Sequence, residues 1–113
     1  MDKIKKYRRA IKEILGRYKE ILDRRENPPL ESVFIFDQQN DNYTWLKFGW
    51  QNGRRFEGIS VFVRLKNGKF YIEEDWTEEG IAVELMEKGV PAKDIVLAFQ
   101  QPEMRQYTEF ALS

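Results

Sequence analysis

The chain has 113 residues, and we expect residues 1–113 to form a single domain. Apolar residues make up 42% and charged residues 34%, so a hydrophobic core can form beneath a well-solvated surface. The sequence contains neither Cys nor His, which excludes disulfides, thiol nucleophiles, most zinc sites and every general base that depends on imidazole.

Charge is balanced overall but unevenly distributed along the chain. Nineteen basic and nineteen acidic side chains give a net charge of zero, which does not favour a general nucleic-acid binder. Residues 1–27 carry ten basic and five acidic side chains, so this segment has a net charge of +5 and the rest has −5. No apolar run reaches the roughly 20 residues of a membrane span, and no signal-peptide core follows the basic start. We expect a cytoplasmic protein that does not enter a membrane.

The first segment has the apolar spacing of an amphipathic helix. Apolar residues recur at steps of three and four, and the helix should begin near Asp2 or Lys3 and end before Pro28. Basic residues occupy its other faces, as either a solvated surface or a binding site for an acidic partner or DNA phosphates. The candidate basic surface consists of Lys5, Arg8, Arg9 and Lys12.

Four strands follow, with two Asn-Gly pairs between them. Asn52-Gly53 and Asn67-Gly68 supply the positive φ angles of tight hairpin turns, so the strands should form an antiparallel meander. The predicted strands cover residues 32–36, 43–50, 56–66 and 69–75.

Two-residue loops at both turns would fix the register of the meander. They place Leu65 opposite Phe70, Val63 opposite Ile72, Leu46 opposite Ile59 and Thr44 opposite Val61. One face of the sheet is then expected to be buried and apolar, and the other to be mixed polar and aromatic. The predicted buried face holds Leu46, Phe48, Trp50, Ile59, Val61, Val63, Leu65, Phe70 and Ile72, and the opposite face holds Trp45, Lys47, Ser60, Phe62, Arg64 and Tyr71.

A second helix and a short strand complete the predicted fold. Thr77 is a plausible N-cap with Glu78 and Glu79 in the first turn, and Gly89 fits the position just after the helix end. Residues 95–99 form a short apolar run that we interpret as a buried strand, although periodicity alone does not separate it from helix. The predicted class is therefore α+β, with an N-terminal helix, an antiparallel β-meander of about four strands, a second helix and a short C-terminal strand.

Carboxylates are concentrated between residues 73 and 87. They could bind Mg²⁺ or Ca²⁺ or form an acidic docking surface, whereas helix capping and solvation explain most of them without a ligand. The chain has no glycine-rich phosphate loop and no Glu-x-Lys or Asp-x-Lys tripeptide of a restriction-type nuclease, so we predict neither a cofactor, a metal nor catalytic residues. Exposed aromatic side chains on the sheet could stack on single-stranded nucleic acid, pack across strands or form a dimer surface.

Several separated blocks of the sequence resemble the XisI family, the fdxN element excision controlling factors. The run from Asp75 to Leu85 carries the strongest similarity. The resemblance continues through Gly89-Val90-Pro91, the segment 94–99, Pro102, Arg105 and the segment 108–111. It also includes Tyr7-Arg8 in the first helix and Gly49-Trp50 with residues 52–55 in the central hairpin, so it covers the whole chain.

The resemblance implies a small α+β protein that assists site-specific DNA excision without being an enzyme. It implies an XisH-like companion and a site-specific recombinase as partners, and a homodimer as the assembly. Direct DNA binding by the basic first helix is the alternative. Within the similar blocks, several polar side chains are not needed for packing of the core. We expect one of them, Arg105, to fold back on Asp75 or Glu78 and tie the C-terminal segment to the second helix. These candidate partner-binding or structural residues are Asp75, Glu78, Glu79, Arg105, Thr108 and Glu109.

Overall fold

A computed structural model describes residues 2–113 and confirms the predicted order of elements. A long helix is followed by a five-stranded sheet whose strand order is β1-β2-β3-β4-β5, with β1 and β5 at its edges. The first four strands are antiparallel, and β5 is parallel to β4. The elements are α1 (Lys3–Asp23), β1 (Glu31–Asp37), β2 (Asn42–Gln51), β3 (Arg54–Lys66), β4 (Lys69–Asp75), α2 (Ile81–Glu87), the 3₁₀ helix η1 (Ala92–Asp94), β5 (Ile95–Leu97) and the 3₁₀ helix η2 (Pro102–Tyr107).

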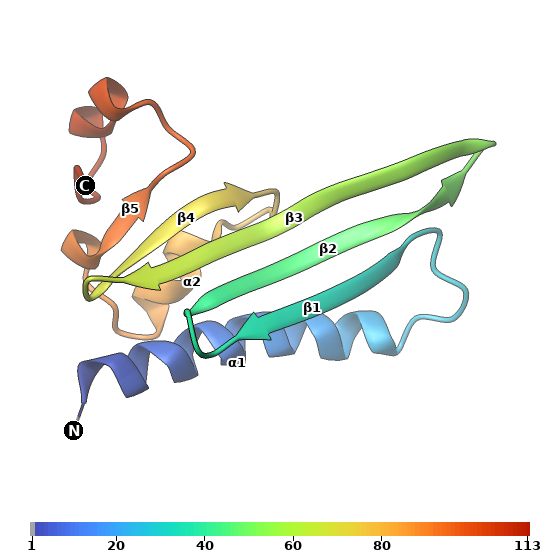
Figure 1. The fold of residues 1–113 in the computed structure, drawn as a ribbon, viewed down its shortest axis with the longest axis horizontal. Coiled ribbons are helices and arrows are strands. Elements are labelled where there is room, and N and C mark those ends of the chain that lie inside the picture. Colours follow the sequence, from blue (N-terminus) through green and yellow to red (C-terminus); the bar gives the residue numbers. More distant parts are fainter. Residues whose placement is uncertain (1) are drawn as a thin grey trace.

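Both α-helices pack on one face of the sheet, and this face forms the core. Figure 1 shows α1 running along the sheet, with α2 next to it behind β3 and β4. α1 packs on the sheet because its apolar residues recur at helical spacing. Its buried residues therefore form one stripe that faces the strands. The fully buried core residues on both sides of this contact include Ile11, Ile14, Leu15, Tyr43, Val61, Val63, Phe70, Ile72, Ile81 and Leu85.

The start of α1 is fixed by a cap and by a buried polar contact. Asp2 is the N-cap, and its Oδ1 accepts a hydrogen bond from the Ile4 amide at 3.0 Å. One turn later, the ring of Tyr7 stacks on Phe70 with centroids 5.2 Å apart. The Tyr7 hydroxyl donates to Asp94 Oδ2 at 2.5 Å, so a single side chain joins α1 to both β4 and η1.

The register beside both Asn-Gly turns is as predicted, and the register in the middle of β2 and β3 is not. Leu65 pairs with Phe70 and Leu46 with Ile59, but Thr44 pairs with Phe62 rather than with Val61. Ser60 is an extra residue in β3 at this point, because Trp45 pairs with Val61 and its neighbour Leu46 pairs with Ile59. Such a bulge shifts the alternation of side chains by one residue.

The bulge reverses the predicted faces beyond it. Trp45, predicted to lie on the outer face, is 6% exposed and packs under α1. The prediction that Leu46, Phe48, Trp50 and Ile59 are buried is wrong, because these four residues lie on the face that no helix covers. Ser60, also predicted to face outward, is buried.

The second helix begins later than predicted. Its first residue is Ile81 and its N-cap position is Gly80 at φ 95°, so Thr77 is not the N-cap and the two following glutamates precede the helix. The C-terminal prediction is confirmed, since Gly89 has φ 94° and the Val90 amide donates to the Leu85 carbonyl at 3.0 Å.

The hairpin of β2 and β3 extends beyond the rest of the sheet as a two-stranded arm. Figure 1 shows its tip reaching past β1 and β4. The radius of gyration is 15.0 Å, whereas a compact domain of this length is expected near 13 Å. In residues 2–113, no helix has the length and apolar character needed to cross a membrane.

We expect Tyr7→Phe to lower the free energy of unfolding by about 2 kcal/mol at pH 7, because buried Asp94 loses a hydrogen bond to its charged form. Burial opposes ionisation of Asp94, but the hydrogen bonds from Tyr7 and Lys3 outweigh it and hold its pKa below the ordinary 3.8. This contribution is present above pH 3.8 and disappears as the pH falls through the native pKa.

Urea unfolding at neutral pH and near pH 3 measures this effect, and the difference between wild type and variant should shrink in acid. Tyr107→Phe is the matched control, because the side chain of Tyr107 is exposed and removal of its hydroxyl should leave stability unchanged. An equal loss at both pH values would contradict the assignment to Asp94.

Candidate functional site

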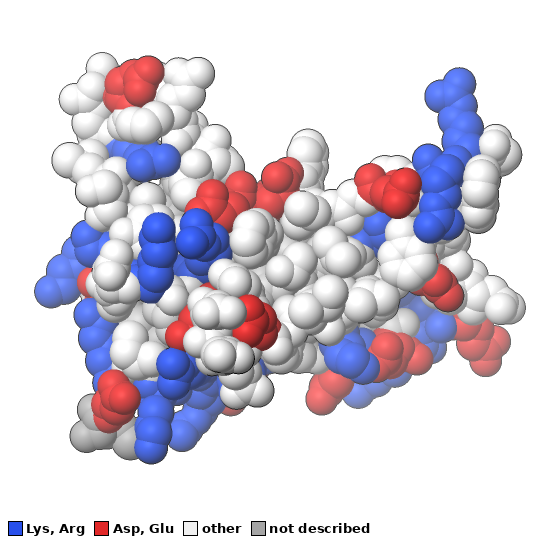
Figure 2. Space-filling view, in the orientation of Figure 1, with Lys and Arg blue, Asp and Glu red and all other residues white. Residues whose placement is uncertain are grey.

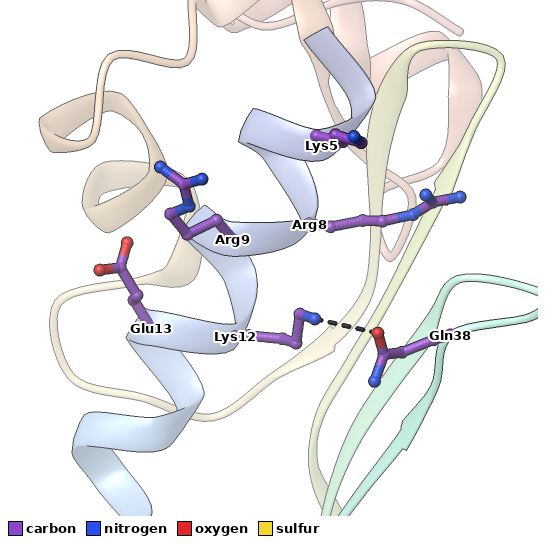
Figure 3. Close-up of a pocket in the computed structure, with 6 residues that line it drawn as sticks. All are labelled: Lys5, Arg8, Arg9, Lys12, Glu13 and Gln38. Carbon is purple, nitrogen blue, oxygen red and sulfur yellow. Dashed lines mark hydrogen bonds between the residues drawn. The ribbon is translucent and has the colours of Figure 1, made fainter. Parts of the chain in front are cut away.

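The four basic residues singled out in the sequence lie together on α1. Lys5, Arg8, Arg9 and Lys12 line one shallow hollow of about 490 Å³, together with Glu13 and Gln38. In Figure 3, Arg8 and Lys12 extend toward the strands, whereas Arg9 and Glu13 extend away from them. The basic surface therefore continues around the solvent side of the helix.

Arg8 serves the fold rather than a ligand. Its Nε and Nη2 donate to the two carboxylate oxygens of Asp41 at 2.8 and 3.0 Å, in a bidentate pair that joins α1 to the turn between β1 and β2. Buried Tyr43 also donates to Asp41, at 2.8 Å. The hydrogen bond from Arg8 lowers the pKa of the Asp41 carboxyl. Burial is the main cause that raises the pKa of the Tyr43 hydroxyl, and the hydrogen bond to Asp41 acts in the same direction.

The other three cations on this surface form no ion pair with a carboxylate within residues 2–113. Lys12 Nζ donates to the neutral side chain of Gln38 at 3.0 Å, which leaves its charge uncompensated. Lys5, Arg9 and Lys12 therefore offer positive charge and free donors to an anionic group. We call these three residues the α1 cationic surface.

The acidic stretch does not form one site. Glu74 accepts from Trp76 Nε1 at 2.6 Å, and Glu73 lies 3.8 Å from Arg64 in a loose ion pair. Glu78 and Glu79 are exposed in the bend before α2. In the part of the chain that the structure describes, no three acidic side chains are arranged to share a metal ion.

Asp75 is the polar residue that starts α2. Its Oδ1 accepts from both the amide and the hydroxyl of Thr77, at 2.9 and 2.7 Å, and its Oδ2 accepts from the Ile81 amide at 2.7 Å. The Thr77 hydroxyl in turn accepts from the Gly80 amide at 3.1 Å. Side chains at the end of β4 and in the bend therefore accept hydrogen bonds from the first amides of α2. This explains why the helix begins at Ile81.

Glu84 joins the two helices and is 3% exposed. It accepts hydrogen bonds from Arg17 and from the Tyr18 hydroxyl, the latter at 2.6 Å. Burial raises the pKa of Tyr18 to about 12, and the bond to Glu84 acts in the same direction. Glu84 is thus a structural carboxylate and is not available for docking.

The expected pair between Arg105 and Asp75 or Glu78 does not form. Arg105 instead donates to the backbone carbonyls of Gln100, Leu112 and Ala98, at 3.2, 3.2 and 3.3 Å, so it holds the C-terminal segment together. These three carbonyls lie within seven residues of Arg105 in the sequence, whereas Asp75 is 30 positions away (105 − 75). Thr108 accepts from the Phe110 amide at 3.2 Å and donates to the Arg105 carbonyl, and Glu109 is exposed.

Sequence reasoning missed Asp41, Asp94 and Glu84, the three carboxylates that hold α1. Asp41 has φ 56° in a turn, which is typical of Asp, and nothing in the local pattern indicates an arginine partner 33 residues away. Glu84 lies within the apolar stripe of α2, between Ile81 and Leu85. A glutamate at such a position indicates a buried carboxylate, so the sequence did contain a signal for this residue.

The chain is similar to proteins of one family over its full length. It matches the family model described as XisI protein over residues 1–112. The crystal structure of the fdxN element excision controlling factor XisI from Anabaena variabilis ATCC 29413 has 37% sequence identity and a TM-score of 0.86, and covers 99% of this chain and 100% of that chain. A XisI-like protein from the same organism has 31% identity and a TM-score of 0.86, with the same coverage. No curated protein sequence matches the chain.

We expect Asp75→Ala to lower the free energy of unfolding by about 2 kcal/mol, because it removes an acceptor from two amides and one hydroxyl at the start of α2. Glu79→Ala removes an exposed carboxylate four residues later and should change stability by less than about 0.5 kcal/mol. Thermal unfolding followed by circular dichroism measures both. Equal effects of the two substitutions would show that Asp75 is not the cap.

Proposed function

Since the chain belongs to the XisI family, we propose that it is a cytoplasmic, non-enzymatic accessory factor that controls site-specific excision of a DNA element. The family match over residues 1–112 supports the excision role, because a relative of the same length and fold is an fdxN element excision controlling factor. The absence of Cys and His from the sequence supports a binding role rather than catalysis.

The protein acts by binding other proteins, an XisH-like companion and a site-specific recombinase. The observation that carries this proposal is the α1 cationic surface: Lys5, Arg9 and Lys12 have no carboxylate partner in the described residues, while their neighbour Arg8 is bound by Asp41. The three uncompensated charges are therefore available to an acidic surface on a partner.

Charge of this kind acts mainly on the rate of association. Complementary surface charges orient an encounter and raise the association rate constant, and salt screens them beyond about 10 Å at 0.1 M. The acidic rest of the chain, with a net charge of −5 over residues 28–113, gives the molecule an electric dipole. A partner with an acidic patch would thus approach with α1 facing it.

Direct contact of α1 with DNA is the second candidate function. The same three cations favour it, because they could neutralise backbone phosphates. Neutralising three phosphates gives a slope of only about −2.7 in a plot of log affinity against log salt. The net charge of zero supplies no wider attraction, so this contact would be weak without another protein.

Lys5→Glu combined with Arg9→Glu tests the proposal. We expect the association rate constant with an XisH-like companion to fall about tenfold at low salt, and the difference from wild type to vanish at high salt. Arg24→Glu combined with Arg25→Glu makes the same change in charge at the other end of α1, at exposed positions, and is the matched control. Surface-plasmon resonance over a salt series measures the rates.

Binding of the isolated protein to duplex DNA over the same salt series separates the two candidate functions. Identical rates for the two double variants with the companion would contradict the protein-binding role. A measurable DNA affinity that only the Lys5 and Arg9 variant loses would favour direct DNA contact instead.

A further inference from the structure

The first half of β3 has a neighbouring strand on only one side. β2 pairs with β3 from Arg54 to Arg64, whereas β4 pairs with it only from Val61 to Lys66. Figure 1 shows β3 continuing past the end of β4 along the two-stranded arm. Residues 54–59 span about 20 Å as a strand, and no other strand of residues 2–113 lies on that side of them. We call residues 54–59 of β3 the open edge.

The main chain of the open edge has unused hydrogen-bonding groups. Asn52 and Gly53 have φ angles of 52 and 76°, which is typical of a two-residue hairpin loop. The residues that flank such a loop bond to each other, so the main chain of Arg54 and of every second residue after it faces β2. The N–H and C=O groups of Arg55 and Glu57 therefore point away from β2, where no other segment of residues 2–113 bonds to them.

The chain turns away from the open edge where β4 ends. The Trp76 amide donates to the Ser60 carbonyl at 2.9 Å, and the indole Nε1 donates to Glu74, so the exposed ring is held at the inner end of the open edge. The other margin of the arm is shorter, because β2 extends only three residues beyond β1. It is also partly covered, since a Cβ atom at Gly49 would lie 3.3 Å from the Leu30 side chain.

A groove follows the open edge. Its volume is about 550 Å³, and its lining includes Phe56, Gly58, Ile59 and Ser60 of β3 on one side and Glu74 and Trp76 on the other. Consecutive strand residues point to opposite faces of a sheet, so a groove lined by residues 58–60 runs along the strand rather than over one face. Phe56, Ile59 and Trp76 are 45, 42 and 76% exposed, which suits an occupant with apolar side chains.

The tip of the open edge is basic. Arg54 and Arg55 are exposed, and neither forms an ion pair with a carboxylate in the part of the chain that the structure describes. The Arg55 guanidinium lies 5.7 Å from the ring centroids of both Phe48 and Trp50, and Arg54 points to the other face of the strand. Figure 2 shows basic groups at the tip and an uncharged surface between the charged tip and the end of β4. A carboxylate at the tip would therefore meet a cation on either face.

We propose that the open edge binds an extended segment of a partner protein, which joins the sheet as a strand antiparallel to β3. The unused main-chain groups select a polypeptide, because they require N–H and C=O groups at strand spacing. An antiparallel segment continues the direction of β4, so it enters beside Trp76 and ends at the arginines of the tip. It has about six residues, with apolar side chains in its middle and carboxylates at its C-terminal end.

This inference goes beyond the proposed function and does not rest on it. The open edge lies on the arm, whereas the α1 cationic surface lies on the N-terminal half of α1. The Lys5 and Arg9 double variant should therefore bind the extended segment as wild type does. Variants of the open edge keep every cation of α1, so failure of one proposal leaves the other standing.

Fluorescence anisotropy with a labelled synthetic peptide tests the proposal on the full chain. The peptide alternates valine and threonine and ends in two aspartates. We expect saturable binding to wild type and about tenfold weaker binding to Arg54→Glu combined with Arg55→Glu. Arg24→Glu combined with Arg25→Glu makes the same change in charge at exposed positions of α1 and its C-cap, and should bind as wild type does. No saturable binding to wild type up to about 1 mM peptide would overturn the proposal.

A change in the main chain separates strand pairing from contact through side chains alone. Glu57→Pro removes an N–H that points away from β2, a position at which an edge strand tolerates proline, and should weaken binding of the same peptide about tenfold. Glu57→Thr removes the same charge, keeps the N–H and should bind as wild type does. Circular dichroism checks that both variants fold.

Peptides with N-methyl groups on alternate amides decide the question if Glu57→Pro does not fold. The methyl groups block strand pairing in one of the two possible phases, so one methylated peptide should lose binding and the other should keep it. Equal binding of both methylated peptides would overturn the proposal. Protection of the Arg55 and Glu57 amides from hydrogen exchange in the protein alone would also overturn it, because a second copy would then occupy the open edge.

Discussion

Three carboxylates hold α1 against the rest of the molecule, and the arrangement of every surface depends on them. Asp94 of η1 accepts from Tyr7, Asp41 in the turn before β2 accepts from Arg8, and Glu84 of α2 accepts from Arg17 and Tyr18. Apolar packing alone gives a helix some freedom to slide or rotate, whereas directional bonds to three separate elements fix its position. The rotation of α1 about its axis determines which cations face solvent.

The fixed rotation separates two groups among the cations of α1. Lys3, Arg8 and Arg17 are held by carboxylates of the fold, whereas Lys5, Arg9 and Lys12 pair with no carboxylate in the part of the chain that the structure describes. Net charge and composition do not distinguish these groups. The distinction is the basis of the proposed binding role, and it is a property of tertiary structure.

Much of the fold was predictable because its signals are local. Apolar spacing defines α1, the two Asn-Gly turns define the meander, and Gly89 ends α2. The bulge at Ser60 was not predictable, because its residues have ordinary strand character and the pairing partner alone reveals the extra residue. The same limit applies to the candidate site: sequence placed the four basic residues on one helix, but the bond between Arg8 and Asp41 spans 33 positions.

The edge strand β1 carries its own protection against uncontrolled growth of the sheet. An uncovered strand that is apolar on both sides is a template for edge-to-edge aggregation. Glu31 and Asp37 are its two ends. If two β1 strands paired antiparallel about Phe34, Glu31 of each would lie opposite Asp37 of the other, and these like charges would repel. The acidic ends thus act as gatekeepers that disfavour fibril-like stacking through β1.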